Sequence, residues 1–165
     1  STASHTTGQK ILEPSDLTKY QSSQFDAITL WHVLEHVHDI DLVLGEFNRI
    51  LKNTGILVIA VPNHLSYDAA YYKSFWAAYD VPRHLYHFNP SVIELLLQRF
   101  GFELISMKPM WFDAFYVSLL SEKYKGDKVK FVPAICVALI SNIKALFKPG
   151  TCSSQIYVFR KTFNK

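Results

Sequence analysis

The sequence predicts an α/β fold with a mostly parallel sheet, and residues 25–61 carry most of the evidence. "FDAITLW" is a compact apolar run rich in β-branched and aromatic residues, which is typical of a buried strand. Apolar residues then recur every three or four positions from Ile40 to Leu51, which indicates an amphipathic helix. "ILVIAV" is apolar at every position, as in a strand that is buried on both faces of a parallel sheet. The three elements together form a βαβ unit with a right-handed crossover.

The helix of this unit has recognisable ends, and a second unit repeats the pattern. His38 or Asp39 can cap the first helix, and Asn53 and Gly55 should end it before the next strand. Further along, Asn89 is a good N-cap and Pro90 suits the first helical position. Gly101 then ends the second helix, and a strand is expected over 102–110.

The last third of the chain predicts two more helices, about 112–124 and 131–147, and a final strand over 154–161. We interpret 1–165 as a single domain in which 111–150 is a helical insertion. The longest apolar run, 131–140, is about half of the roughly 20 residues that a membrane span needs.

The composition excludes several classes of protein. Of the 165 residues 49% are apolar and 19% are charged, so the chain can bury a core and is not disordered. A net charge of +3 without a basic run between aromatic residues does not indicate nucleic-acid binding. Cys136 and Cys152 form neither a disulfide framework nor a CxxC pair, and no signal peptide opens the chain, so we expect a cytoplasmic protein.

One motif at the end of the first strand has the spacing of a metal site. "WHVLEHVHDI" contains His32-x-x-Glu35-His36, the zinc signature of inverted metalloproteases. That chemistry needs both histidines on one helical face, where residues four apart are neighbours. The helical period begins only near Asp39, so the motif spans a strand-to-helix turn. We therefore predict no metal here. His36 is expected to bond backbone, and Glu35 to be favoured by the positive amino-terminal end of the helix.

Two longer segments resemble class I S-adenosylmethionine-dependent methyltransferases. "FDAITLWHVLEHVHDIDLVLGEFNRILKNTGILVIAVPN" matches the second half of that family, from a Phe-Asp strand through a Leu-Glu-His turn to a strand ending in Pro-Asn. "RHLYHFNPSVIELLLQRFGFELI" is similar to the family's downstream segment. The resemblance covers about 10–110 and the last strand. It implies a Rossmann-like fold, an antiparallel last strand beside 102–110, and S-adenosylmethionine as cofactor.

The family's glycine-rich loop and its ribose-binding acidic residue are absent from this sequence. None of the six glycines lies close to another. Both features are expected before Ser1, so we expect the N-terminal strands of the fold to be missing. Because that loop approaches the methionine and ribose, we also predict weak S-adenosylmethionine binding by this chain alone.

The resemblance suggests where the remaining cofactor contacts lie. It places Asp16 and Leu17 near the adenine, where a carboxylate can accept from the exocyclic amine. It places Trp31 and His32 near the methionine part of the cofactor. Trp31 and His32 also end a strand, and ligands of such sheets bind at the carboxyl ends of the strands.

Methyl transfer is an in-line displacement that needs a positioned acceptor, and a general base helps when the acceptor is a hydroxyl. Histidine is the best-matched base near neutral pH, and we predict catalytic roles for His32, His84 and His87. For binding of a small-molecule acceptor we predict two residues of the turn and two of the aromatic-rich segment 64–88: Glu35, His36, Tyr67 and Arg83.

Three alternatives stay open. The chain can be a methyltransferase-like binding protein without catalysis. Some quinone-pathway O-methyltransferases resemble this turn and bind a divalent metal through Glu and Glu-His; here His32 stands in place of the first glutamate. Lysines flank the apolar helix 131–147, as in an interfacial membrane anchor. We favour a helical insertion that covers the acceptor pocket, and the sequence does not distinguish oxygen, nitrogen and carbon acceptors.

Overall fold

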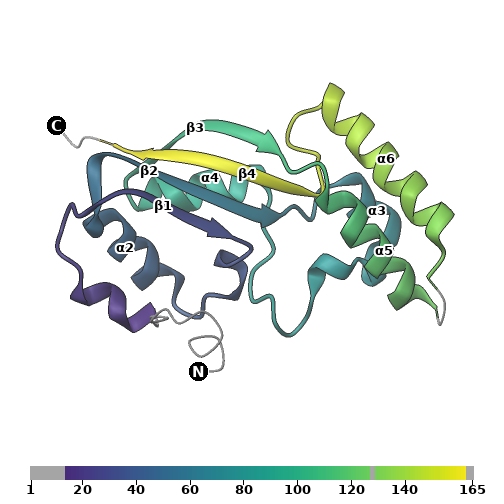
Figure 1. Ribbon diagram of the computed structural model, residues 1–165, viewed down its shortest axis with the longest axis horizontal. Helices are drawn as coiled ribbons and strands as arrows, with labels where there is room; N and C mark the ends of the chain where they lie inside the picture. The colour runs from purple at the N-terminus through teal and green to yellow at the C-terminus, as the bar shows by residue number, and fades with distance from the viewer. Residues whose placement is uncertain (1–13, 127–128, 163–165) are drawn as a thin grey trace, which may run out of the picture.

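The computed structural model describes residues 14–126 and 129–162, and its centre is a four-stranded sheet. The strands are β1 (Phe25–Trp31), β2 (Leu51–Pro62), β3 (Phe102–Pro109) and β4 (Ser154–Lys161), in the spatial order β1-β2-β4-β3. β1 and β2 are parallel, and β4 runs antiparallel to both β2 and β3. Three strands therefore share one direction and β4 alone opposes them, which confirms the predicted Rossmann-like arrangement (Figure 1).

The helices follow the predicted order, with short 3-10 turns between them. The α-helices are α2 (Ile40–Ile50), α3 (Tyr67–Tyr72), α4 (Pro90–Arg99), α5 (Asp113–Lys125) and α6 (Phe131–Phe147). The 3-10 turns are η1 (Pro14–Lys19), η2 (Leu34–His36), η3 (Lys73–Phe75) and η4 (Ala77–Tyr79). The segment 64–88 contains α3 because the side chain of Ser66 caps it, accepting from the backbone N–H of Ala69 at 3.2 Å.

One predicted boundary is wrong. Leu51 was expected in the first helix and the next strand at 56, but α2 ends at Ile50 and β2 begins at Leu51. The reason is the pairing of Leu51 with Phe25 at the start of β1, which draws the chain into the sheet directly after the helix. The second helix begins as predicted: the side chain of Asn89 accepts from Val92 N at 3.0 Å.

The main core lies between the sheet and the helices α2 and α4. Leu57 and Ile59 of β2 are fully buried, as is Phe159 of β4. Leu44 of α2 and Leu97 of α4 pack into the same cluster. The sheet and its two covering helices thus form one apolar unit that fixes the carboxyl ends of β1 and β2.

A second, smaller unit stands beyond those carboxyl ends, where α3, α5 and α6 gather (Figure 1). Its centre is Asp68 of α3, which is fully buried. The Asp68 carboxylate accepts from Trp76 Nε1 at 2.7 Å, from Ser141 Oγ at 2.8 Å and from Ser153 Oγ at 2.7 Å. These three donors come from the segment after α3, from α6 and from the start of the last strand, so one carboxylate joins all three.

Helix α6 packs against this unit with small residues and turns its large residues outward. Ala134, Val137, Ala138, Ser141 and Ala145 are buried, and Val137 is the largest of them. The residues of its opposite side, which we call the outer face of α6, are all apolar and all exposed: Phe131, Val132, Ile135, Cys136, Leu139, Ile140, Ile143, Leu146 and Phe147. Within the described part of the chain, no helix is long and apolar enough to cross a membrane.

Candidate active site

His32 directly follows β1 and has an unusual backbone conformation. Its N–H donates to the carbonyl of Ala60 at 2.9 Å, which extends the sheet by one residue. Its φ is +52°, in the left-handed region that residues other than glycine rarely adopt. Such backbone strain is concentrated at functional sites, where the surrounding structure holds it in place. The turn brings the imidazole of His32 to the carboxyl edge of the sheet.

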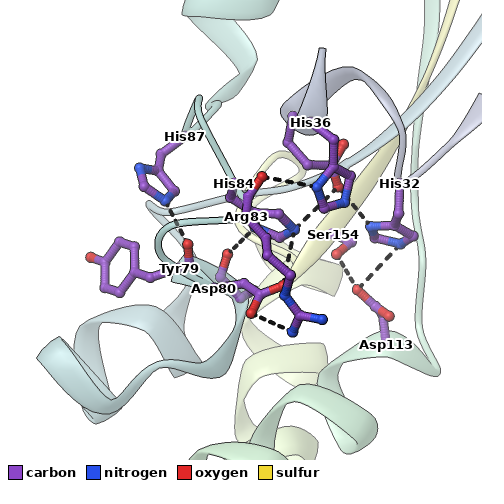
Figure 2. Close-up of polar contacts among 11 residues, drawn as sticks. His32, His36, Tyr79, Asp80, Arg83, His84, His87, Asp113 and Ser154 are labelled. Atoms are coloured by element: carbon purple, nitrogen blue, oxygen red, sulfur yellow. Dashed lines mark hydrogen bonds and ion pairs between the residues drawn. The ribbon is translucent and has the colours of Figure 1, made fainter. Parts of the chain in front are cut away.

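Two carboxylates flank this imidazole. Nδ1 of His32 lies 3.3 Å from Oε1 of Glu35, and Nε2 lies 3.8 Å from Oδ2 of Asp113 (Figure 2). The Glu35 carboxylate, with a further contribution from Asp113, raises the pKa of His32 above its ordinary value, although burial acts in the opposite direction. Ser154 Oγ donates to the same oxygen of Asp113 and holds that carboxylate in place.

Glu35 is buried, which corrects the expectation of an exposed carboxylate at a helix terminus. It belongs to η2, one turn before α2, and its side chain is fully shielded from solvent. No described residue forms a hydrogen bond of good geometry with either carboxylate oxygen. A buried carboxylate is costly without positive charge nearby. His32, whose pKa is raised, can supply that charge as an imidazolium.

The segment 77–88, which we call the cover segment, lies over this turn. Its Leu85 N–H donates to the carbonyl of Glu35 at 2.8 Å. The Nδ1 atom of His84 lies 2.8 Å from the carbonyl oxygen of Ala78. Because a carbonyl can only accept, Nδ1 carries a proton and Nε2 of the neutral ring keeps a lone pair. That Nε2 is 3.9 Å from Oε1 of Glu35.

His36 is oriented in the same way. Its Nδ1 lies 3.0 Å from the carbonyl oxygen of Arg83, which agrees with the expected hydrogen bond to backbone. Its ring packs edge-on against the ring of His84, with 4.6 Å between the ring centres. Atoms of Glu35, His36 and His84 lie within 4.8 Å of one another, a donor set that a divalent cation can use. This set contains His84 instead of His32, so it differs from the zinc motif considered above.

A cavity of about 320 Å³ opens between the end of β1, the cover segment and α5. His32 and His84 line it from one side and Tyr116 and Leu120 of α5 from the other. The remaining lining residues are Pro62, Ala77, Ala78, Asp80, Arg83, Asp113 and Val117. The cavity therefore combines apolar walls with a few converging polar groups, which is the usual composition of a small-molecule site.

A family model described as "Methyltransferase domain" matches residues 4–107 of the chain. The chain belongs to this methyltransferase family. The family confirms the predicted cofactor, S-adenosylmethionine, as its methyl donor. A comparison with the curated proteins finds no match.

Solved structures share the fold of this methyltransferase domain at low sequence identity. A SAM-dependent methyltransferase from Archaeoglobus fulgidus is 16% identical with a TM-score of 0.54, over 93% of this chain and 66% of the other. One from Thermotoga maritima, a possible histamine N-methyltransferase, is 16% identical with a TM-score of 0.56, over 87% and 59%. The cyclase SpnF is 15% identical with a TM-score of 0.56, over 99% and 61%. The chain thus spans about two thirds of the length of these structures.

Not all of the predicted residues of the methyltransferase domain meet at the cavity. Arg83 lies at its rim, with Nη2 2.6 Å from Oδ1 of Asp80. His87 is exposed outside it, with Nε2 2.9 Å from the carbonyl oxygen of Tyr79, and Figure 2 shows the pair apart from His32. Tyr67 lines a different hollow, beside α6. Trp31 ends β1 and is 50% exposed, outside the lining of the cavity.

The two residues predicted for adenine lie elsewhere again. Asp16 and Leu17 belong to η1, where Asp16 pairs with Lys19 and the carbonyl of Leu17 accepts from Nη2 of Arg49 at 3.1 Å. Leu17 lines an apolar hollow of about 220 Å³ together with Phe25 of β1. Its walls are apolar and include the rings of Tyr20 and Phe25, but this hollow is separate from the cavity at His32.

Sequence reasoning missed Asp113 and Asp80, which supply the carboxylates facing His32 and Arg83. Asp113 had one signal, because an acidic residue in the first turn of a helix is favoured by the helix dipole. That signal explains why an acidic residue occurs at the start of α5, but it does not predict that Asp113 lies beside His32. Only the packing of α5 against the cover segment brings Asp113 to the end of β1.

Proposed function

We propose that this chain forms the acceptor side of an S-adenosylmethionine-dependent methyltransferase acting on a small molecule, and that His32 is the residue that meets the acceptor. The observation that carries the proposal is the position of its imidazole. Nε2 is buried, it has no hydrogen-bond partner among the described residues, and its ring lines the cavity at the carboxyl edge of the sheet. In parallel α/β sheets this edge is where ligands bind.

The residues at this edge are compatible with one end of the cofactor. S-adenosylmethionine supplies an electrophilic methyl group on a sulfonium sulfur. Trp31 offers an exposed aromatic face at the end of β1, and the ring of an aromatic residue attracts cations. Trp31 and His32 are therefore the residues of this chain proposed to lie near the methionine part, with Asp16 and Leu17 near the adenine.

His32 is placed to accept a proton from a hydroxyl acceptor. Neutral His32 with the proton on Nδ1 has a lone pair on Nε2, the atom that faces Asp113, and both residues line the cavity. When Nε2 takes a proton, the imidazolium lies between the carboxylates of Glu35 and Asp113, which stabilise it. A positioned base of this kind contributes typically about 10²–10⁴-fold to a rate.

The cover segment supplies the other wall. His84 is held by Ala78 with its Nε2 toward Glu35, and Arg83 is held at the rim by Asp80. We propose that His84 and Glu35 orient His32, and that Arg83 limits the entrance to the acceptor. His36 does not line this cavity, and its predicted contact with the acceptor stays a prediction of the sequence. Tyr67 and His87, which lie outside the cavity, stay predictions of the sequence without a role in this proposal.

The test is titration of the isotope-labelled chain with S-adenosylhomocysteine, followed by NMR. We expect weak binding, with chemical-shift changes at Trp31 and His32. His32→Gln should abolish the changes at Trp31, whereas His87→Gln, outside the cavity, should leave them. Changes confined to other parts of the sheet would contradict the proposed site. A low-micromolar dissociation constant would show that the expected loss of cofactor affinity is wrong.

The proposal includes no metal, because Nδ1 of His32 lies 3.3 Å from Oε1 of Glu35 and carries a proton toward it in both the neutral and the protonated ring. Metal analysis of the purified, tag-free protein tests this point. One equivalent of zinc bound to two imidazole nitrogens, at about 2.0–2.1 Å from each, would overturn it. Loss of that metal in His84→Gln would then identify the set of Glu35, His36 and His84 as the ligands.

A further inference from the structure

The outer face of α6 reverses the usual distribution of side chains. At about 100° per residue, its nine members fall within about half of the helix circumference. One polar residue, Asn142, lies near the edge of that half, where it is half-buried and its amide donates to the carbonyl of Trp111 at 2.9 Å. Phe131 at one end and Phe147 at the other are 64% and 85% exposed. Single exposed apolar residues are ordinary on a protein surface, but a continuous stripe along a whole helix marks a binding surface.

The charges in the sequence next to α6 are mostly positive. Between residues 123 and 150 the sequence has six lysines and one acidic residue, Asp127. Lys130 directly precedes α6, Lys144 lies in its last turn, and Lys148 directly follows it. The ammonium group of Lys144 lies 4.9 Å from the ring centre of Tyr67, at the border of the apolar face. Lysines placed at such a border can extend toward negative charge while their stems stay on apolar surface.

A hollow of about 430 Å³ continues the face toward α3. Ile143 and Phe147 of α6 line it together with Leu65, and Lys144 and Lys148 stand at its edge. An apolar slot with two ammonium groups matches the chemistry of a lipid with an anionic headgroup and an acyl chain. The convex shape of a single helix face also suits a lipid surface, since a bilayer adapts to the side chains that enter it.

We propose that the outer face of α6 docks on an anionic membrane surface, with the helix in the plane of the interface. The helix has 17 residues, and none of the described helices can span a bilayer, so the proposal concerns surface binding. Apolar burial and attraction between lysines and anionic lipids act together in such helices. The proposal does not depend on methyl transfer, because its residues lie outside the cavity at His32.

The sequence provides its own probe for this contact. Cys136 lies in the outer face and is exposed, whereas the other cysteine, Cys152, is buried. An environment-sensitive fluorophore on Cys136 therefore reports whether this face enters an apolar phase. We expect a blue shift of its emission with vesicles of phosphatidylcholine and phosphatidylserine, and a much smaller one with phosphatidylcholine alone. No shift with either vesicle would overturn the proposal.

Variants on the unlabelled protein separate the two contributions in a vesicle sedimentation assay. The double variant Leu139→Gln, Ile143→Gln should weaken binding at least tenfold, while Leu95→Gln, an exposed leucine of α4, should leave it unchanged. Lys144→Glu should weaken binding roughly fivefold on anionic vesicles, since each lysine near such a surface contributes on the order of 1 kcal/mol. Equal binding by the double variant and Leu95→Gln would overturn the proposal.

A measurement of the oligomeric state tests whether a second copy of the chain, instead of a membrane, covers this face. If the face joins two copies of the chain, wild type is a dimer in size-exclusion chromatography with light scattering, and the double variant is a monomer. That result, without vesicle binding, would also overturn the proposal. The proposal is supported if wild type is a monomer that binds anionic vesicles and the double variant is a monomer that does not. The thermal midpoints of the variants should match wild type, because the altered side chains are exposed.

Discussion

Helices α2 and α6 are both rich in apolar residues, yet they use them in opposite ways. In α2 the large side chains of Leu44, Phe47 and Ile50 are buried against the sheet, and polar residues face outward. In α6 mainly alanine and serine are buried, with the single valine Val137, and the largest residues form the exposed outer face. A hydrophobic pattern therefore identifies a helix in both cases, but it identifies the buried side only in α2.

The two helices are also held by different forces. α2 is stabilised by burial of large apolar side chains, which contributes roughly 1.5–3 kcal/mol for each one fully buried. α6 buries one valine, Val137, and otherwise small side chains, and its Ser141 donates to the buried Asp68. Small interface residues bring backbones close and leave the large side chains available for another surface. The difference separates a helix that builds the core from one that presents a face.

The largest difference should appear when one leucine is truncated in each helix. Leu44→Ala removes a fully buried side chain, and we expect it to lower the free energy of unfolding by about 3 kcal/mol. Leu146→Ala removes a side chain that is 66% exposed and should cost less than about 0.5 kcal/mol. Urea denaturation of both variants measures the difference. A similar loss for both would show that the outer face of α6 packs against protein.

Removing the polar anchor of α6 should have the next largest effect. Asp68→Ala leaves the donors of Trp76, Ser141 and Ser153 without their acceptor inside the protein. We expect a loss of about 2–3 kcal/mol, since each unsatisfied buried group costs roughly 1–3 kcal/mol and the site can relax. Ser141→Ala removes only one donor and should cost about 1 kcal/mol. Hydrogen exchange should show the loss in α6 before the sheet; uniform loss across both would contradict the view that Asp68 anchors this unit.

A smaller difference is expected at the starts of the two helices. The side chain of Asp39 caps α2 by accepting from Leu42 N at 3.0 Å, whereas Lys130 at the start of α6 makes no side-chain cap. Asp39→Ala should cost about 1 kcal/mol, because a helix donor loses its partner. Lys130→Ala should cost nothing measurable, because a cation at that end of a helix is unfavourable to the helix itself. Thermal unfolding of the two variants distinguishes them, and a loss for Lys130→Ala would reveal a contact of that lysine within the protein.

The sequence predicted the fold better than the site, for identifiable physical reasons. The spacing of apolar residues and the helix caps depend on residues close together in the sequence. The sequence therefore predicted α4 with its Asn89 cap and the strand at 154–161. The end of α2 was missed because Leu51 is drawn into the sheet by Phe25, a partner distant in sequence. The site depends still more on distant contacts. His32 was predicted from the family resemblance and from its place at the end of a strand, but Asp113 lies beside it only through the packing of α5, which no spacing in the sequence encodes.

The smallest effect that we expect is on the pH dependence of stability. It concerns the segment before α2, which contains His32 with its raised pKa, whereas no described residue in the segment before α6 has a shifted pKa. The folded-state pKa of His32 is raised by Glu35 and Asp113, so the pair stabilises the protein fully below the unfolded pKa of about 6.5. That stability is lost as the pH rises through the higher, folded pKa. His32→Gln should therefore differ from wild type most near pH 6 and least near pH 9. The effect is limited because the His32 side chain is 32% exposed.

An NMR titration of the His32 ring measures the pKa directly, and Asp113→Asn should lower it by removing one flanking charge. A His32 pKa at or below its ordinary value in wild type would contradict the account of Glu35 as a carboxylate neutralised by its neighbour.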